Sequence, residues 1–157
     1  MSQRYWDPSR RLLETIHSYQ NSRTRLFRGI AVIRHHFWSA VSGADIPLNS
    51  KISASLHLPH PNGVVIHPAA HIGPDCMIMQ QVTIGVKHGI CNDAPHLERG
   101  VNVGAGAKIL GNITIGAYSV IGANAVVTHN VPAGVVVAGI PARIIGSVAS
   151  LKQRTGS

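Results

Sequence analysis

Histidine is the residue type in this sequence that offers the most chemistry, because the chain contains ten of them. A neutral imidazole can take the proton of a hydroxyl group while that oxygen attacks an acyl carbon, since histidine titrates close to neutral pH. The thiols are less informative: Cys76 and Cys91 form no CxxC pair, which indicates reduced cysteines rather than a disulfide. Residue types alone leave all ten histidines as candidates for a general base.

The elements that must position these side chains show a period of six residues. A step of six would scatter its aliphatic members over three faces of an α-helix, but it keeps them on one face of an extended chain. The members are Val103, Ile109, Ile115, Ile121 and Val127, and an earlier series consists of Ile66, Ile72, Ile78 and Ile84. The sequence therefore predicts a mainly β protein, a hexapeptide-repeat solenoid with three repeats per triangular coil.

Glycine directly follows the aliphatic residue in several repeats, where a corner can need a positive φ or a close backbone approach. These glycines are Gly73, Gly85, Gly104, Gly116 and Gly122. The repeats are interrupted once, by a polar and glycine-rich stretch over residues 86–100. We expect this stretch to project from the coil as a loop, and long loops on a regular scaffold are where function tends to lie.

The ends of the chain depart from the six-residue period. Residues 1–43 contain two stretches with helical spacing, the first capped by Asp7 and Pro8 and the second ending at Gly43. We expect an N-terminal helical cap over 1–43, the solenoid over 44–147 and a polar tail over 148–157 that can add a short helix. Only 4% of the residues are aromatic, which suits a narrow interior filled by Ile, Val and Ala.

Positive charge is concentrated near the N-terminus. The net charge is +8, and seven of the fourteen Lys and Arg residues lie in the first 34 positions. No zinc spacing, RNP-like pattern or recognition-helix signature accompanies them, so we expect no nucleic-acid partner. A solvated helix face remains open, as does attraction to an anionic substrate or a lipid headgroup. No segment has the features of a signal peptide or a membrane span, and we expect a cytoplasmic location.

Several segments resemble the serine acetyltransferase family of left-handed β-helix acyltransferases. They are "DIPLNSKIS", "LPHPNGVVIHPAAHIGPDCMIMQQVTIG", "GAGAKILGNITIG" and "VPAGVVVAGIPARIIG", and the resemblance extends over residues 44–147. The resemblance implies a left-handed coil, which the repeat alone does not reveal. It also implies a homotrimer that binds acetyl-CoA in a cleft between neighbouring solenoids and transfers the acetyl group to a hydroxyl.

The resemblance also assigns roles to individual residues. His60 matches the family's catalytic histidine, and Asp45 matches the aspartate that orients it. Ala105 and Ala123, eighteen residues or one coil apart, match backbone contacts to the pantetheine arm. Beyond the resemblance, the charge of CoA makes Lys108 and Arg143 candidates for pairing with its phosphates. The general need for an oxyanion donor makes a backbone N–H near Gly85 a candidate for that role.

The acceptor positions depart from the family pattern. Pro59 stands where the serine enzymes have an aspartate, and Asp93 and Ala94 stand where they have an Arg-His pair. A free amino acid calls for a bidentate Arg and an acid. We therefore expect a sugar hydroxyl of a polysaccharide precursor as the acceptor, as in short members from polysaccharide clusters, with L-serine as the alternative. The candidate substrate contacts are His88, His96 and Arg99.

Other functions also remain open. The chain ends in "QRTGS" rather than in the isoleucine tail by which family members hold cysteine synthase, so we expect no such partner. The basic N-terminal helices could contact a membrane surface. His67 and His71 could serve a zinc site of the β-helix carbonic anhydrase type, although we expect no metal. A non-catalytic scaffold is the remaining alternative.

Overall fold

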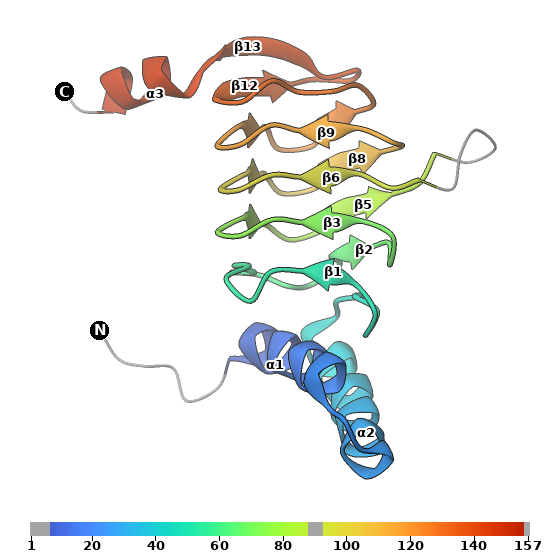
Figure 1. The fold of residues 1–157 in the computed structure, drawn as a ribbon. Coiled ribbons are helices and arrows are strands. Elements are labelled where there is room, and N and C mark those ends of the chain that lie inside the picture. The colour runs from blue at the N-terminus through green and yellow to red at the C-terminus, as the bar shows by residue number, and fades with distance from the viewer. Residues whose placement is uncertain (1–6, 88–92, 156–157) are drawn as a thin grey trace.

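The structure is a computed structural model in which residues 7–87 and 93–155 are described. Two helices, α1 (Pro8–Asn21) and α2 (Arg25–Ser42), lie at one end of a stack of coils, and α3 (Val148–Thr155) lies at the other end (Figure 1). Asp7 caps α1 as predicted, since its Oδ1 accepts a hydrogen bond from the Arg10 backbone N–H at 3.1 Å. Gly43 ends α2 with a φ of 68°, also as predicted.

Between the helices, the described chain forms three sheets of short strands. The first sheet has the order β11-β8-β5-β2, the second β1-β3-β6-β9 and the third β13-β12-β10-β7-β4. The pairs are parallel except β12 with β13. The bounds are β1 Lys51–Ile52, β2 Val65–Ile66, β3 His71–Ile72, β4 Met77–Ile78, β5 Thr83–Gly85, β6 His96–Leu97, β7 Asn102–Val103, β8 Lys108–Leu110, β9 Thr114–Ile115, β10 Val120–Ile121, β11 Val126–Val127, β12 Val135–Ala138 and β13 Arg143–Ser147.

The chain visits the three sheets in turn, so each coil has three sides. Val65 pairs with Thr83, Thr83 with Lys108 and Lys108 with Val126, one coil apart at each step. The aliphatic residues of the six-residue period all point inward and are at most 1% exposed. The predicted solenoid is therefore confirmed, and the period arises because only an aliphatic side chain fits the narrow interior of each side.

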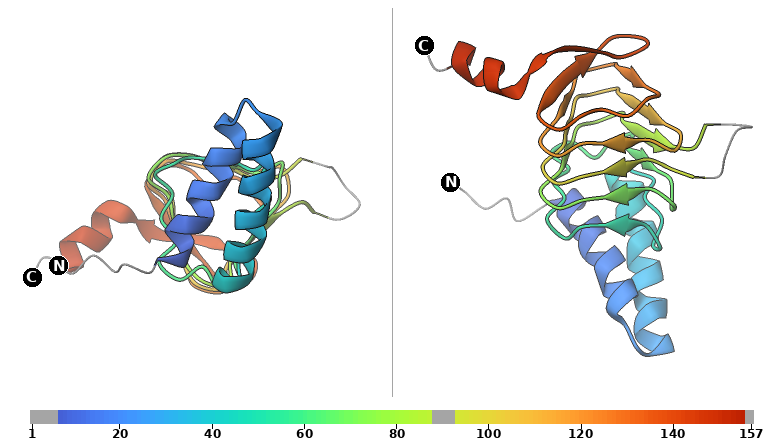
Figure 2. Two further views of the ribbon diagram at one scale, coloured as in Figure 1. Left: turned by 90° about the horizontal axis from the view of Figure 1, so that it is seen from below. Right: turned by 45° about the horizontal axis from the view of Figure 1, so that its top comes forward.

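The helices close one end of this interior. Leu12 and Ile16 of α1 are fully buried and belong to the same core cluster as the first coils. Viewed along the solenoid axis, α1 and α2 lie side by side across the end of the coils (Figure 2). Among the described residues, no helix combines the length and apolarity that a membrane crossing requires.

Two expectations about the turns need correction. A Cβ at Gly104 would lie 2.7 Å from the Ala123 backbone nitrogen, as a close corner requires, whereas nothing lies within 4 Å of a Cβ at Gly85. The reason is that the chain leaves the coil after Gly85. The projecting segment is also shorter than residues 86–100, because Leu97 is fully buried and β6 rejoins the second sheet.

Candidate functional site

One corner of the solenoid collects most of the predicted functional residues. We define the His60 corner as the turns that lead from the third sheet to the first, over residues 58–64, 79–82, 104–107 and 122–125, together with the turn over 139–142, which joins β12 to β13 and hydrogen-bonds to Val126 of β11. His60, Ala105 and Ala123 lie in three of these turns, and Lys108 follows one of them at the start of β8. Because neighbouring strands are about 4.8 Å apart, Ala105 lies about 10 Å along the corner from the turn that carries His60.

His60 and Asp45 flank the first of these turns. The Asp45 N–H donates to the Val64 carbonyl at 2.8 Å, which places its backbone beside the end of the turn that carries His60. Both side chains are exposed and can be reached by a substrate. In the described chain no hydrogen bond or ion pair joins the His60 ring to the Asp45 carboxylate. The structure thus places the segments that carry the two residues side by side, but their side chains do not make the contact that a catalytic pair would make.

Ala105 and Ala123 present two unused donors. Their neighbours are engaged, because the N–H of Gly106 donates to Gln80 and the N–H of Asn124 donates to Ala105, at 2.9 Å and 2.8 Å. Over residues 7–87 and 93–155, the N–H groups of Ala105 and Ala123 themselves have no hydrogen-bond partner. Ala123 is exposed and Ala105 is half-buried. Two free amide donors, one coil apart, fit an extended ligand that carries amide carbonyl groups.

Two cations lie along the same corner. The Lys108 ammonium donates to the Gln81 carbonyl at 2.6 Å, so it is held in the turn of the preceding coil. Arg143 follows the last turn of the corner, is exposed, and donates from Nη1 to the carbonyl of Ala142 at 2.9 Å. Each cation keeps donors that are free for phosphate oxygens.

The remaining predicted residues lie elsewhere on the chain. Gly85 ends β5 on the side where the loop leaves, and His88 lies outside the described residues. His96 is on the outer face of the second sheet, where its ring stacks on that of His71 with 4.4 Å between the centroids. Arg99 forms an ion pair with Asp75 at 3.3 Å. A single chain therefore does not bring Gly85, His96 or Arg99 to the His60 corner.

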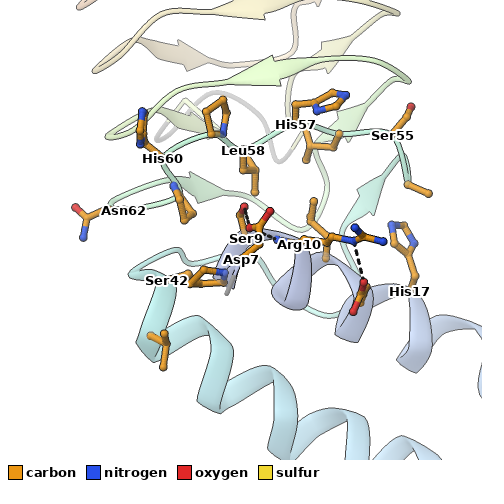
Figure 3. A pocket seen from close by; sticks show the side chains of 18 of the residues that line it. Asp7, Ser9, Arg10, His17, Ser42, Ser55, His57, Leu58, His60 and Asn62 are labelled. Atoms are coloured by element: carbon orange, nitrogen blue, oxygen red, sulfur yellow. Dashed lines mark hydrogen bonds and ion pairs between the residues drawn. The ribbon is translucent and has the colours of Figure 1, made fainter. Parts of the chain in front are cut away.

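A large open pocket adjoins the His60 corner. It has a volume of about 1160 Å³ and lies between α1 and the first coil, with His60 and His57 on one wall and Asp7 and His17 on the other (Figure 3). His57 and His17 are residues that our sequence reasoning missed. The sequence predicted a helix with a polar face ahead of the repeats, but it did not indicate which coil that helix covers.

Charged groups in the pocket are already paired. Arg10 donates to Glu14 at 3.1 Å, and Asp7 accepts from the hydroxyl of Ser9 at 2.6 Å. Partial burial alone would raise the pKa of Asp7, but hydrogen bonds from Ser9 and Arg10 lower it overall. The Nε2 atom of His17 is buried and has no partner among the described residues. The pocket thus offers imidazole, hydroxyl and amide groups rather than an unpaired cation.

The histidines proposed for zinc do not assemble. The described residues contain no group of three or more His, Cys, Asp or Glu side chains that could hold a metal ion. His67 accepts a hydrogen bond from the Ala69 N–H, and His71 stacks on His96. Burial and the nearby charges of His96 and Lys51 lower the pKa of His71. Cys76 is buried, its thiol donates to the Glu98 carbonyl, and burial raises its pKa.

Comparison with known proteins places these features in context. Residues 94–129 match the family described as Bacterial transferase hexapeptide (six repeats). The chain is 40% identical over 126 residues to the serine acetyltransferase of Salmonella typhimurium, an alignment that covers 80% of this chain and 46% of the relative. The chain spans about half the length of the curated relatives it matches.

Solved structures show the same architecture. The Brucella abortus serine acetyltransferase in complex with coenzyme A has a TM-score of 0.76 and 34% identity, covering 86% of this chain and 54% of that one. The soybean serine acetyltransferase in complex with serine has a TM-score of 0.74 and 32% identity, covering 88% and 56%.

Proposed function

Because the chain belongs to the serine acetyltransferase-like hexapeptide-repeat acyltransferases, whose left-handed β-helix it shares as predicted, we propose that it transfers the acetyl group of acetyl-CoA to a hydroxyl group. The free N–H groups of Ala105 and Ala123 on the corner that carries His60 are the observation that supports this proposal. The pantetheine arm of CoA contains two amide carbonyl groups, and a row of amide donors suits it. Lys108 and Arg143 would pair with the phosphates.

The chemistry would rest on His60. Its neutral ring would remove the proton of the acceptor hydroxyl as the oxygen attacks the thioester carbon. The Asp45 carboxylate would approach the other ring nitrogen, fix the tautomer and stabilise the imidazolium. The imidazolium would then return the proton to the departing sulfur, so that CoA leaves as a thiol. A backbone N–H such as that of Gly85 would hold the oxyanion only if another copy supplied it.

We propose a homotrimer, because several of the predicted site residues lie away from the His60 corner. His96 and Gly85 lie away from the His60 corner of their own chain. A neighbouring solenoid packed against this corner could bring its own His96 and Arg99 there, and the predicted contact His88 would then come from the same copy. A complete site would then combine residues of two copies. The absence of a cysteine synthase partner and the cytoplasmic location stay predictions.

L-Serine is the acceptor that the comparisons favour. The relatives described above are serine acetyltransferases, and one of them is solved with serine. This support is better than that for the sugar acceptor that we expected from the sequence. The sugar hydroxyl remains a second candidate because the large pocket beside His60 offers hydroxyl, amide and imidazole groups, while its Arg10 is already paired with Glu14.

Release of CoA thiol from acetyl-CoA tests the proposal and separates the two acceptors. We expect purified wild-type protein to release CoA with L-serine, at a rate well above that with no acceptor. A panel of nucleotide sugars and free sugars, run in parallel, would instead show the faster release if the acceptor is a glycan. No acceptor-dependent release with either class would contradict acetyl transfer and favour the scaffold.

A further inference from the structure

The outer face of α2 carries an apolar stripe that nothing in the described chain covers. We define the α2 stripe as Leu26, Ile30, Ile33, Phe37 and Val41, which follow one helix face at spacings of four, three, four and four residues. They are 42–73% exposed, and Ile33 is 72% exposed. The buried residues of α2, Ala31, His35 and Ser42, lie on the opposite side. Surface side chains of this size normally occur singly rather than in a continuous row.

One arginine borders the α2 stripe, and no acidic residue lies on the helix. At 100° per residue, Arg34 falls about 20° beyond Val41 at one edge of the stripe, whereas Arg25 falls about 80° beyond Ile33 at the other, past Gly29 and His36. Both are exposed. Arg28 is directed elsewhere, because its guanidinium lies over the Tyr19 ring and donates to the Ser22 carbonyl. An apolar face with arginines at its edge and on its flank, on a helix without acidic residues, is the pattern of a helix that lies in the interface of an anionic bilayer.

A second copy of the chain is a poor match for this surface. Two stripes packed together would bring the arginines of both copies close to one another. The chain has six carboxylates, and five of them already accept hydrogen bonds or ion pairs. These are Asp7, Glu14, Asp75, Asp93 and Glu98. Anionic phosphate headgroups above an apolar layer would complement both parts of the surface.

We propose that the α2 stripe binds an anionic lipid surface, with its aliphatic and aromatic side chains inserted below the headgroups and Arg25 and Arg34 paired with phosphates. Figure 1 shows α2 extending away from the first coil, at the end of the molecule opposite α3. The stripe lies on the side of α2 opposite its buried residues. The contact would hold the solenoid at a membrane while its corners remain in water. The inference does not depend on the acetyl transfer proposed above.

Flotation with lipid vesicles tests the inference. We expect wild-type protein to float with vesicles of phosphatidylcholine and phosphatidylglycerol, and to bind pure phosphatidylcholine far less. Ile33→Ser combined with Phe37→Ser should lower the vesicle partition coefficient by about tenfold or more, since each substitution removes apolar contact with lipid. Arg25→Gln with Arg34→Gln should lower it about fivefold per arginine, and added salt should weaken wild-type binding.

The matched control is Ile144→Ser with Ile145→Ser, which removes two isoleucines of similar exposure, 57% and 67%, from β13 at the far end. This variant should bind anionic vesicles like the wild type. Equal binding by the stripe variant, or no wild-type binding at all, would overturn the inference. If the wild type does not bind vesicles and the stripe variant has a lower mass in solution than the wild type by light scattering, the stripe would instead be a contact between copies of the chain. CoA release without vesicles should be unchanged in the stripe variant, which separates this result from a failure of the proposed function.

Discussion

His60→Ala should lower the acceptor-dependent kcat for CoA release by about a hundredfold to ten-thousandfold, the range that a general base contributes. Without the imidazole, the acceptor hydroxyl keeps its proton as it attacks, and the departing sulfur finds no proton donor. The melting temperature should stay at the wild-type value, because the His60 side chain is exposed and makes no hydrogen bond within the described chain. Steady-state kinetics and thermal unfolding of the same preparations measure both effects.

His129→Ala is the matched control for this substitution. His129 is also an exposed histidine in a turn of the solenoid, but it lies away from the His60 corner, and its ring shares a hydrogen bond with the Thr128 hydroxyl. This variant should keep the wild-type kcat. If His60→Ala kept more than about a tenth of the wild-type kcat, His60 would not be the base. The neighbouring pocket histidines, His57 and His17, would then be the next residues to test.

Ile115→Ala should lower the free energy of unfolding by about 2–5 kcal/mol, the usual cost of such a truncation in a core. Ile115 is fully buried in β9 and belongs to the row of aliphatic residues that fills the solenoid. The coils above and below it are held by parallel strand pairs, so the cavity cannot easily collapse. Urea unfolding at one fixed protein concentration measures the change, since association would also affect stability.

Ile145→Ala provides the comparison for that measurement. It makes the same chemical change at a site that is 67% exposed on β13. We expect a change of no more than about 0.5 kcal/mol there. Equal destabilisation at both sites would mean that burial inside the solenoid does not determine stability, which would contradict the core as described.

The fold could be predicted because each repeat obeys a local constraint. Most strands of the coil are two residues long, the first facing outward and the second inward, so the inward position is aliphatic wherever the chain stays in register. The projecting segment was harder to bound. Leu97 resumes the period inside a polar stretch, and a single buried leucine does not stand out in a sequence of this composition.

The site could be predicted only in part. The residues alone left ten histidines, and the resemblance, not the spacing, singled out His60. The pocket could not be foreseen, because it forms between α1 and the first coil, and nothing in the spacing of "DPSRRLLETIHSYQ" determines where that helix docks. The unused donors of Ala105 and Ala123 were also invisible, since only the stacked turns show which N–H groups are already engaged.

Amide hydrogen exchange with and without CoA tests the central claim most directly. In the free protein, the N–H groups of Ala105 and Ala123 should exchange rapidly, because no acceptor protects them. Saturating CoA should slow both by about tenfold or more, while exposed amides on the second sheet keep their rates. Unchanged exchange at both alanines, with protection at another face of the solenoid, would show that the His60 corner is not the CoA site.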